Sequence, residues 1–157
     1  MPGSTHGHPL QIPVGETGCV SFTTRRVPRQ MDAITEQFLA ALHDLHRNGE
    51  VEPLVDLFGD DAVLTKAGLP HQQHGKEGAR SFWQNYRDVF DAIEASFQHS
   101  AGDDRIAFLE WTSYGTLRDG SDFSYDGVSV LEGDGDTIDA FRTYYDTSAF
   151  LSGTVKR

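Results

Sequence analysis

The chain has 157 residues, of which 24 are Asp or Glu and 13 are Lys or Arg, giving a formal net charge of −11. Phosphate backbones and anionic lipid surfaces repel so acidic a chain, so we expect no nucleic acid and no membrane among its partners. Its single cysteine, Cys19, excludes an internal disulfide. No apolar run is as long as a membrane span or a signal-peptide core, which makes a cytoplasmic location the default expectation.

Residues 1–28 differ in composition from the rest of the chain. They are rich in Pro, Gly, Ser and Thr and show no sustained helical period. We therefore predict an irregular N-terminal arm, in which residues 19–22 could add a short strand. A single domain is predicted to follow over residues 29–157, because this length supports one sizeable core.

Two helices are predicted from apolar side chains at helical spacing. The first spans residues 31–48, ends at Gly49 and carries Ile34, Phe38, Leu42 and Leu45. The second begins near residue 76 and carries Ala79, Phe82, Trp83, Tyr86, Val89 and Phe90. Between them, the pattern indicates a short helix around Leu54 and a strand over residues 61–66.

Four strands are predicted in the second half of the chain, at roughly residues 92–99, 104–116, 121–132 and 136–146. Asp119-Gly120 and Gly133-Asp134-Gly135-Asp136 are typical of hairpin turns. Helices followed by such a meander predict an α+β fold, in which a curved antiparallel sheet wraps around an N-terminal helical layer.

Alternating residues in the last three strands predict an internal cavity, because side chains two residues apart share one face of a sheet. The set expected to face the helices is aromatic, rich in hydroxyls and holds one carboxylate: Phe108, Glu110, Thr112, Tyr114, Phe123, Tyr125, Gly127, Phe141, Thr143 and Tyr145. Such a set is more polar than a plain core and suits a small-molecule pocket.

The opposite sheet face is predicted to mediate self-association. Its expected members Leu109, Trp111, Val128 and Val130 are apolar enough to need cover from water. One patch can cover its own copy across a two-fold axis, so we expect a symmetric homodimer.

Several short motifs resemble those of one known family. In chain order they are FLAAL (38–42), LFGDDAV (57–63), HGKEG (74–78), FLEWT (108–112), YDGV (125–128) and FRTYYD (141–146). Over residues 31–151 this order looks like the SnoaL-like, ketosteroid isomerase-like branch of the nuclear transport factor 2-like α+β cone superfamily. The resemblance implies a cavity between the concave sheet face and the helices. It implies no single activity, because this cone serves isomerases, cyclases, epoxide hydrolases and non-catalytic modules.

The catalytic residues that the resemblance would supply are not retained. Ketosteroid isomerases use a tyrosine, a protonated aspartic acid and a carboxylate base, and the residues aligned with them are Phe38, Gly127 and Lys66. The epoxide hydrolases use five polar residues, of which one acid is retained among the aligned Glu110, Phe108, Thr143, Leu64 and Lys66. The acid/base aspartate of the polyketide cyclases falls near Thr143.

Lys66 and Glu110 remain as the candidate catalytic residues, expected together on the cavity wall. Burying either charge alone would cost on the order of several kcal/mol, so they are predicted to face each other or a ligand. They are either a structural ion pair or a functional pair in which Lys66 polarises a carbonyl and Glu110 moves a proton. A Schiff-base role for Lys66 is disfavoured, because a neighbouring carboxylate opposes the lowered pKa that it requires.

Aromatic and hydroxyl side chains complete the predicted ligand-binding site: Phe38, Tyr86, Phe108, Thr112, Tyr114, Tyr125, Thr143 and Tyr145. Their alternative role is ordinary lining of the core. No metal site is predicted, because His71 and His74 lack matching cysteines or clustered acids. No cofactor is expected.

Two functions stay open at this point. One is an enzyme of the isomerase, cyclase or hydrolase type that acts on a small hydrophobic molecule by acid/base chemistry. The other is a non-catalytic module that binds a small-molecule ligand or dimerises. The polar pair favours the first, and the loss of the standard catalytic residues favours the second.

Overall fold

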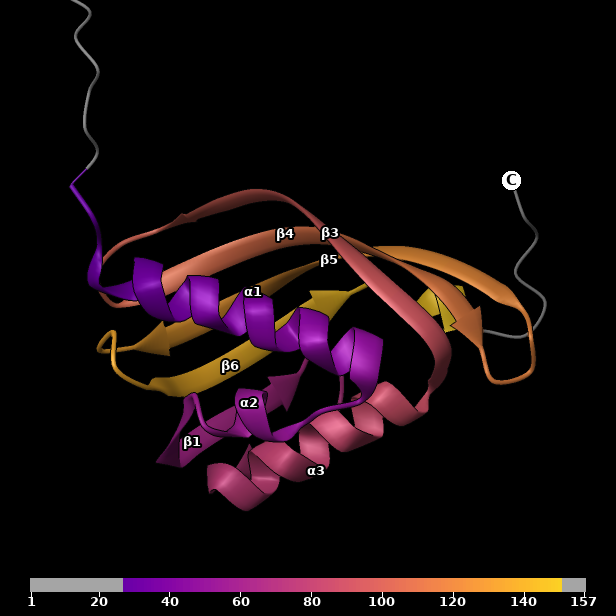
Figure 1. Cartoon of the computed structure of the whole chain (residues 1–157), viewed down its shortest axis with the longest axis horizontal. Helices are drawn as coiled ribbons and strands as arrows, with labels where there is room; N and C mark the ends of the chain where they lie inside the picture. Colours follow the sequence, from indigo (N-terminus) through magenta and orange to yellow (C-terminus); the bar gives the residue numbers. More distant parts are fainter. Residues whose placement is uncertain (1–26, 151–157) are drawn as a thin grey trace, which may run out of the picture.

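Helices cover one side of a curved, open sheet (Figure 1). The structure, a computed structural model, describes residues 27–150. Its elements are α1 (Gln30–Asn48), α2 (Glu52–Val55), β1 (Phe58–Lys66), β2 (Gln73–His74), α3 (Gly75–Asp88), β3 (Phe90–Gly102), β4 (Ile106–Leu117), β5 (Asp122–Gly133), β6 (Ile138–Tyr145) and the 3₁₀-helix η1 (Thr147–Phe150). The predicted strand at residues 19–22 and almost all of the predicted arm lie outside the described residues.

The predicted helices are confirmed, and their buried apolar residues enter one core, but α3 ends at Asp88: Phe90 belongs to β3, and Val89 is exposed, so neither lies on the helix stripe as predicted. Phe38 and Leu45 of α1 are buried together with Phe82 and Trp83 of α3. Gly49 ends α1 as predicted: it adopts φ of 72°, and its N–H donates to the Leu45 carbonyl at 3.0 Å. The two helices therefore present a continuous apolar surface to the sheet.

The sheet contains the strands in the order β2-β1-β6-β5-β4-β3. Neighbours are antiparallel except β1 and β6, which run parallel. The sheet is thus mixed, whereas a wholly antiparallel one was predicted. After β1 the chain runs through β2, α3, β3, β4 and β5, and β6 then lies beside β1 in the same direction. The α+β cone architecture itself is confirmed.

A three-residue hairpin loop, residues 118–120, sets the register between β4 and β5. The N–H of Leu117 donates to the Ser121 carbonyl at 2.8 Å, so these two residues close the loop. Gly120 has φ of 84° and supplies the left-handed residue that such loops need. A two-residue turn at positions 119 and 120 would shift the pairing by one residue, and such a slip moves every side chain of a strand to the other face.

Because of this register, β4 turns the opposite face to the cavity from the one predicted. Trp111 pairs with Gly127, and Ser113 pairs with Tyr125. The buried members of β4 are Ala107, Leu109, Trp111 and Ser113, whereas Phe108, Glu110, Thr112 and Tyr114 lie on the outer face. The predicted β4 set was wrong because both faces of this strand carry aromatic residues. The inward residues of β5 and β6 were predicted correctly: Phe123, Tyr125, Phe141 and Thr143.

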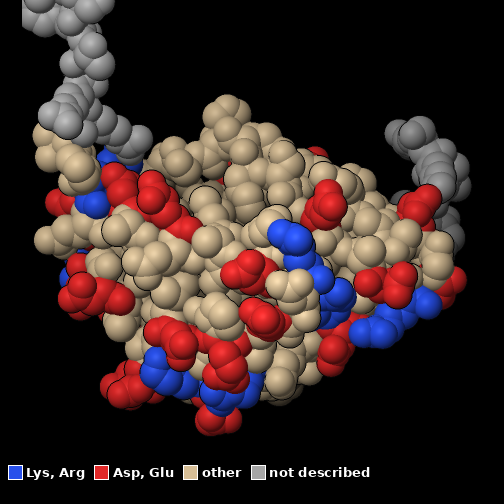
Figure 2. Space-filling model, in the orientation of Figure 1, with Lys and Arg blue, Asp and Glu red and all other residues tan. Residues whose placement is uncertain are grey.

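One face of the molecule carries charged side chains of both signs (Figure 2). Groups of Asp and Glu, with Lys and Arg between them, occupy the face shown in Figure 2. None of the helices in the described part of the chain is long and apolar enough to cross a membrane.

Gly127→Ala tests the register of β4 and β5. A Cβ at this position would clash with the Trp111 indole and would lie 2.6 Å from the Tyr144 carbonyl oxygen. We expect this overpacking to lower the free energy of unfolding by about 1–3 kcal/mol, measured by urea titration. Ser124→Ala, at an exposed position of the same strand, is the control and should change it by less than about 0.5 kcal/mol. An unchanged stability of Gly127→Ala would contradict the Trp111–Gly127 pairing.

Candidate functional site

A cavity of about 320 Å³ lies between the helices and the inner face of the sheet. Small-molecule pockets have volumes of roughly 300–1,000 Å³, so the cavity is large enough for a compact ligand. Its aromatic lining residues are Phe38, Phe82, Trp83, Tyr86, Phe90, Phe97, Trp111, Tyr125, Phe141, Tyr145 and Phe150. Its polar lining residues are Lys66, Ser113, Ser129, Thr143 and Thr147. Among the described residues, no carboxylate lines it.

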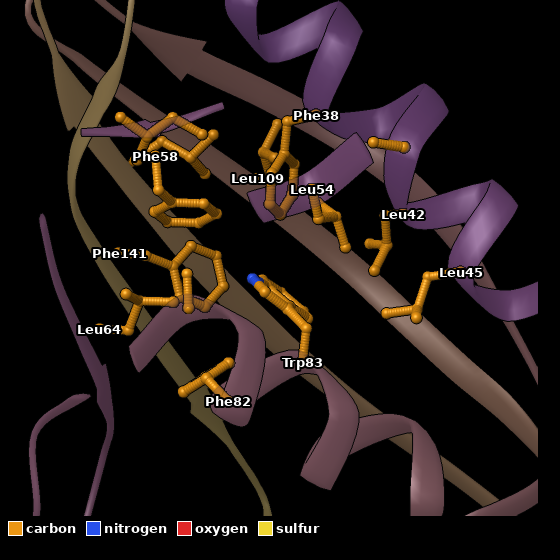
Figure 3. Packing of buried hydrophobic residues seen from close by; sticks show 14 of the residues in the cluster. Phe38, Leu42, Leu45, Leu54, Phe58, Leu64, Phe82, Trp83, Leu109 and Phe141 are labelled. Carbon is orange, nitrogen blue, oxygen red and sulfur yellow. The ribbon is translucent and has the colours of Figure 1, made fainter. Parts of the chain in front are cut away.

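Four rings from three elements pack together in the cavity wall. The Trp83 ring of α3 lies 5.1 Å from Phe141 of β6 and 5.8 Å from Phe38 of α1, centroid to centroid. Phe82 meets Phe141 edge to face at 5.7 Å. Figure 3 shows these four side chains converging from the two helices and the sheet. Such packing offers ring faces and edges to a flat, apolar ligand.

A chain of hydrogen bonds crosses the buried face of the sheet. The Trp111 indole N–H donates to the Ser129 hydroxyl at 2.9 Å, and this hydroxyl donates to Thr143 Oγ1 at 3.2 Å. All three side chains are buried. Their mutual bonds satisfy polar groups that would otherwise be costly in an apolar wall. The Thr143 hydroxyl proton is not used in this chain, so Thr143 can still donate to a bound molecule.

Lys66 is the one cation that lines the cavity among the described residues. It pairs in register with Thr143 on the neighbouring strand, and its ammonium lies 4.9 Å from the centroid of the Phe82 ring. Burial lowers the pKa of Lys66, because desolvation disfavours the charged form. No Asp or Glu of the described chain forms a salt bridge with it.

At the other end of the cavity, Tyr86 connects the wall to a buried histidine. The Tyr86 hydroxyl and His46 Nε2 are 2.9 Å apart. Burial, with smaller contributions from Arg87 and His43, lowers the pKa of His46 to about 4, so its ring is neutral at neutral pH. Burial also raises the pKa of Tyr86 well above its usual value. The phenol therefore keeps its proton, and the hydrogen bond joins two neutral groups.

Six of the ten predicted site residues line the cavity: Phe38, Lys66, Tyr86, Tyr125, Thr143 and Tyr145. The other four, Phe108, Glu110, Thr112 and Tyr114, lie outside it. On the outer face, Glu110 accepts a hydrogen bond from His99 Nδ1 at 2.6 Å, Thr112 donates to Asp126 at 2.6 Å and Tyr114 donates to Glu94 at 3.0 Å. The predicted proximity of Lys66 and Glu110 was wrong, because the β4 register places Glu110 on the opposite face of the sheet.

The site also contains polar and aromatic residues that were not predicted, among them His46, Trp111, Ser113 and Ser129. Ser129 continues the correctly predicted alternation of Tyr125 and Gly127, so the signal was present. His46 lies four residues after Leu42 on the buried stripe of α1, which is also a readable signal. The inward position of Trp111 and Ser113 could be predicted only from the length of the β4–β5 loop.

Comparisons with known proteins agree on the fold. A SnoaL-like domain model matches residues 35–147. An NTF2-like protein from Anabaena variabilis superimposes with a TM-score of 0.68 at 17% identity, over 76% of this chain and 92% of that chain. An LEH-like epoxide hydrolase from M. tuberculosis gives 0.60 at 18%, over 76% and 85%, respectively. A putative SnoaL-like polyketide cyclase from Jannaschia sp. gives 0.61 at 12%, over 73% and 89%.

These identities are low, so the structural likenesses show the fold alone. No curated protein matches the chain in sequence.

The titration of His46 leads to a testable pH dependence of stability. Its folded pKa of about 4 lies below the ordinary value of 6.5, so the unfolded chain binds more protons between these pH values. Stability must therefore fall as the pH falls through this range, by about 3 kcal/mol from His46 at about 1.4 kcal/mol per pH unit.

Between pH 6.5 and pH 4, the free energy of unfolding of the His46→Gln variant should fall by about 3 kcal/mol less than that of the parent protein. Other titrating groups are shared by both proteins, so the difference between the two curves isolates His46. Urea unfolding at a series of pH values measures it. Parallel curves would show that His46 is not held neutral in the folded state.

Proposed function

We propose that this chain, which belongs to the SnoaL-like domain family, binds a small, mainly hydrophobic molecule in its aromatic cavity. The observation that carries the proposal is an aromatic wall that holds one cation and, among the described residues, no carboxylate. The rings would bury the apolar body of the ligand, and Lys66 and Thr143 would donate to an oxygen atom on it. The proposed ligand contacts are Phe38, Lys66, Tyr86, Tyr125, Thr143 and Tyr145.

Acid/base catalysis of the isomerase, cyclase or hydrolase type is the second candidate function. It is supported by two relatives of the fold, one an epoxide hydrolase and one a putative polyketide cyclase. In this chain such a reaction would depend on Lys66 and the tyrosine phenols, since Glu110 lies on the outer face. Burial raises the pKa of Tyr86 and Tyr125, which suits these phenols to donate hydrogen bonds and makes them poor bases. Binding without catalysis accounts for the observed groups more simply.

The anionic probe 2-naphthoate tests the binding proposal. We expect it to bind in the cavity with its carboxylate at Lys66. Lys66→Met should then weaken binding about tenfold or more, because a hydrogen bond to a charged group contributes about 1.5–3 kcal/mol. Isothermal titration calorimetry measures the affinity.

Glu110→Gln is the matched control for this measurement, since it also changes one charge of the originally predicted pair. It should leave the affinity unchanged, because Glu110 is on the outer face. Equal binding by the parent and Lys66→Met proteins, or weaker binding by Glu110→Gln, would contradict the proposed site.

The same chain is proposed to form a homodimer through the outer face of its sheet. This face lacks the predicted Leu109 and Trp111, which point inward, and retains the half-buried Val128 and the buried Val130. It gains the exposed rings of Phe108, Tyr114 and Tyr144. Phe108 pairs directly with Val130, and Tyr144 pairs with Val128, so the apolar side chains are contiguous across three strands. Burying several hundred Å² of such surface at roughly 25 cal/mol per Å² favours association.

Tyr144→Glu tests the dimer. A carboxylate at the centre of a self-complementary interface meets its own copy, so we expect dissociation to 17.4 kDa monomers at micromolar concentration. Sedimentation velocity measures the mass. Leu69→Glu, which changes an exposed apolar residue of the β1–β2 loop, should remain dimeric. A parent protein that is already monomeric would overturn the proposal.

A further inference from the structure

The two lysines of the described chain have opposite environments. The ammonium of Lys76 donates to the Phe58 carbonyl at 2.8 Å and to the Val55 carbonyl at 3.4 Å, which anchors it to the backbone. The Lys66 ammonium forms no hydrogen bond or ion pair with any described side chain or carbonyl, and it lies over the Phe82 ring, 4.9 Å from its centroid. Lys76 is therefore a structural lysine, while the ammonium of Lys66 is available to a molecule in the cavity.

The surroundings of Lys66 favour its uncharged form. Around the cavity, the hydroxyl groups are those of Thr143 on β6, Thr147 on η1, serines on β4 and β5, and the tyrosines, with no carboxylate among the described lining residues. Desolvation lowers the pKa of the Lys66 ammonium, and no nearby acid opposes that shift. The carboxylate that would have opposed it, Glu110, lies on the other face of the sheet. A larger fraction of Lys66 than of an ordinary lysine is thus a nucleophilic amine at neutral pH.

We propose that Lys66 forms an imine with the aldehyde or ketone group of a small aromatic molecule held in the cavity. This inference rests on the proposed function, because the cavity must first admit the carbonyl compound. The Phe38, Trp83 and Phe141 rings would hold the aromatic body, while Lys66 and its register partner Thr143 lie along one part of the wall. Binding thus brings the carbonyl carbon and the amine together.

The reaction conserves atoms and electrons without an oxidant or reductant. The Nζ lone pair of Lys66 attacks the carbonyl carbon, a C–N bond forms, and the C=O π pair moves to oxygen. A proton passes from nitrogen to that oxygen to give a carbinolamine. The C–O bond then breaks, the oxygen leaves as water with the second nitrogen proton, and the C=N bond forms. The Thr143 hydroxyl can donate a hydrogen bond to the oxygen as negative charge develops.

Reductive trapping with 2-naphthaldehyde and cyanoborohydride tests the imine. The sequence contains only three lysines, Lys66, Lys76 and Lys156, so peptide mass mapping assigns each naphthylmethyl adduct. At neutral pH we expect Lys66 to be labelled about tenfold faster than Lys76 or Lys156, because the cavity holds the aldehyde beside it and desolvation favours its unprotonated form. The selectivity should disappear in denaturing urea, and excess 2-naphthoate should block it.

Two variants separate chemistry from folding and from binding. Lys66→Arg keeps a cation in the cavity but cannot form an imine, so its adduct at position 66 must vanish while 2-naphthoate still binds. The Lys76→Arg variant should be labelled at Lys66 as fast as the parent protein is.

Labelling spread evenly over the three lysines would overturn the imine. A protein that binds 2-naphthoate but gives no Lys66 adduct would also overturn it and leave the proposed binding function intact. A protein that binds neither probe would overturn both.

Discussion

The pairing of Trp111 with Gly127 decides which face of β4 forms the cavity wall. The three-residue loop at 118–120 imposes this pairing, and the missing Cβ of Gly127 leaves room for the indole. With Trp111 inside, its N–H binds Ser129, and Ser129 binds Thr143. The same register turns Glu110 outward to His99. One pairing thus accounts for the aromatic wall, its internal hydrogen bonds and the separation of Glu110 from Lys66.

The cavity's electrostatics follow from that separation. Lys66 is partly desolvated with no acid beside it, whereas Trp111, Ser129 and Thr143 are joined by hydrogen bonds and Tyr86 bonds to His46. A charge in such a position is stabilised by water, by the Phe82 ring or by an electron-rich ligand atom. This favours ligands with an oxygen acceptor on an aromatic or cyclic body. The Tyr86–His46 pair at the other end is neutral at neutral pH and adds no competing charge.

Much of the architecture could be predicted from the sequence, because each helix buries one apolar stripe and because inward and outward residues alternate clearly along β5 and β6. Ile34, Phe38, Phe82 and Trp83 all lie where their spacing placed them. The β4 strand could not be predicted in this way, since Phe108 and Tyr114 on one face are as apolar as Leu109 and Trp111 on the other. Loop length decides between them, and Asp119-Gly120 fits either a two-residue or a three-residue loop. The homodimer and the cytoplasmic location stay predictions.

A crystal structure of the protein soaked with 2-naphthoate would show both the ligand position and the β4 register. We expect ring density among Phe38, Trp83 and Phe141, with the carboxylate within hydrogen-bond distance of Lys66 Nζ and with Glu110 on the outer face of the sheet. Glu110 inside the cavity facing Lys66 would contradict the register. An empty cavity, with the probe bound elsewhere on the surface, would contradict the proposed site.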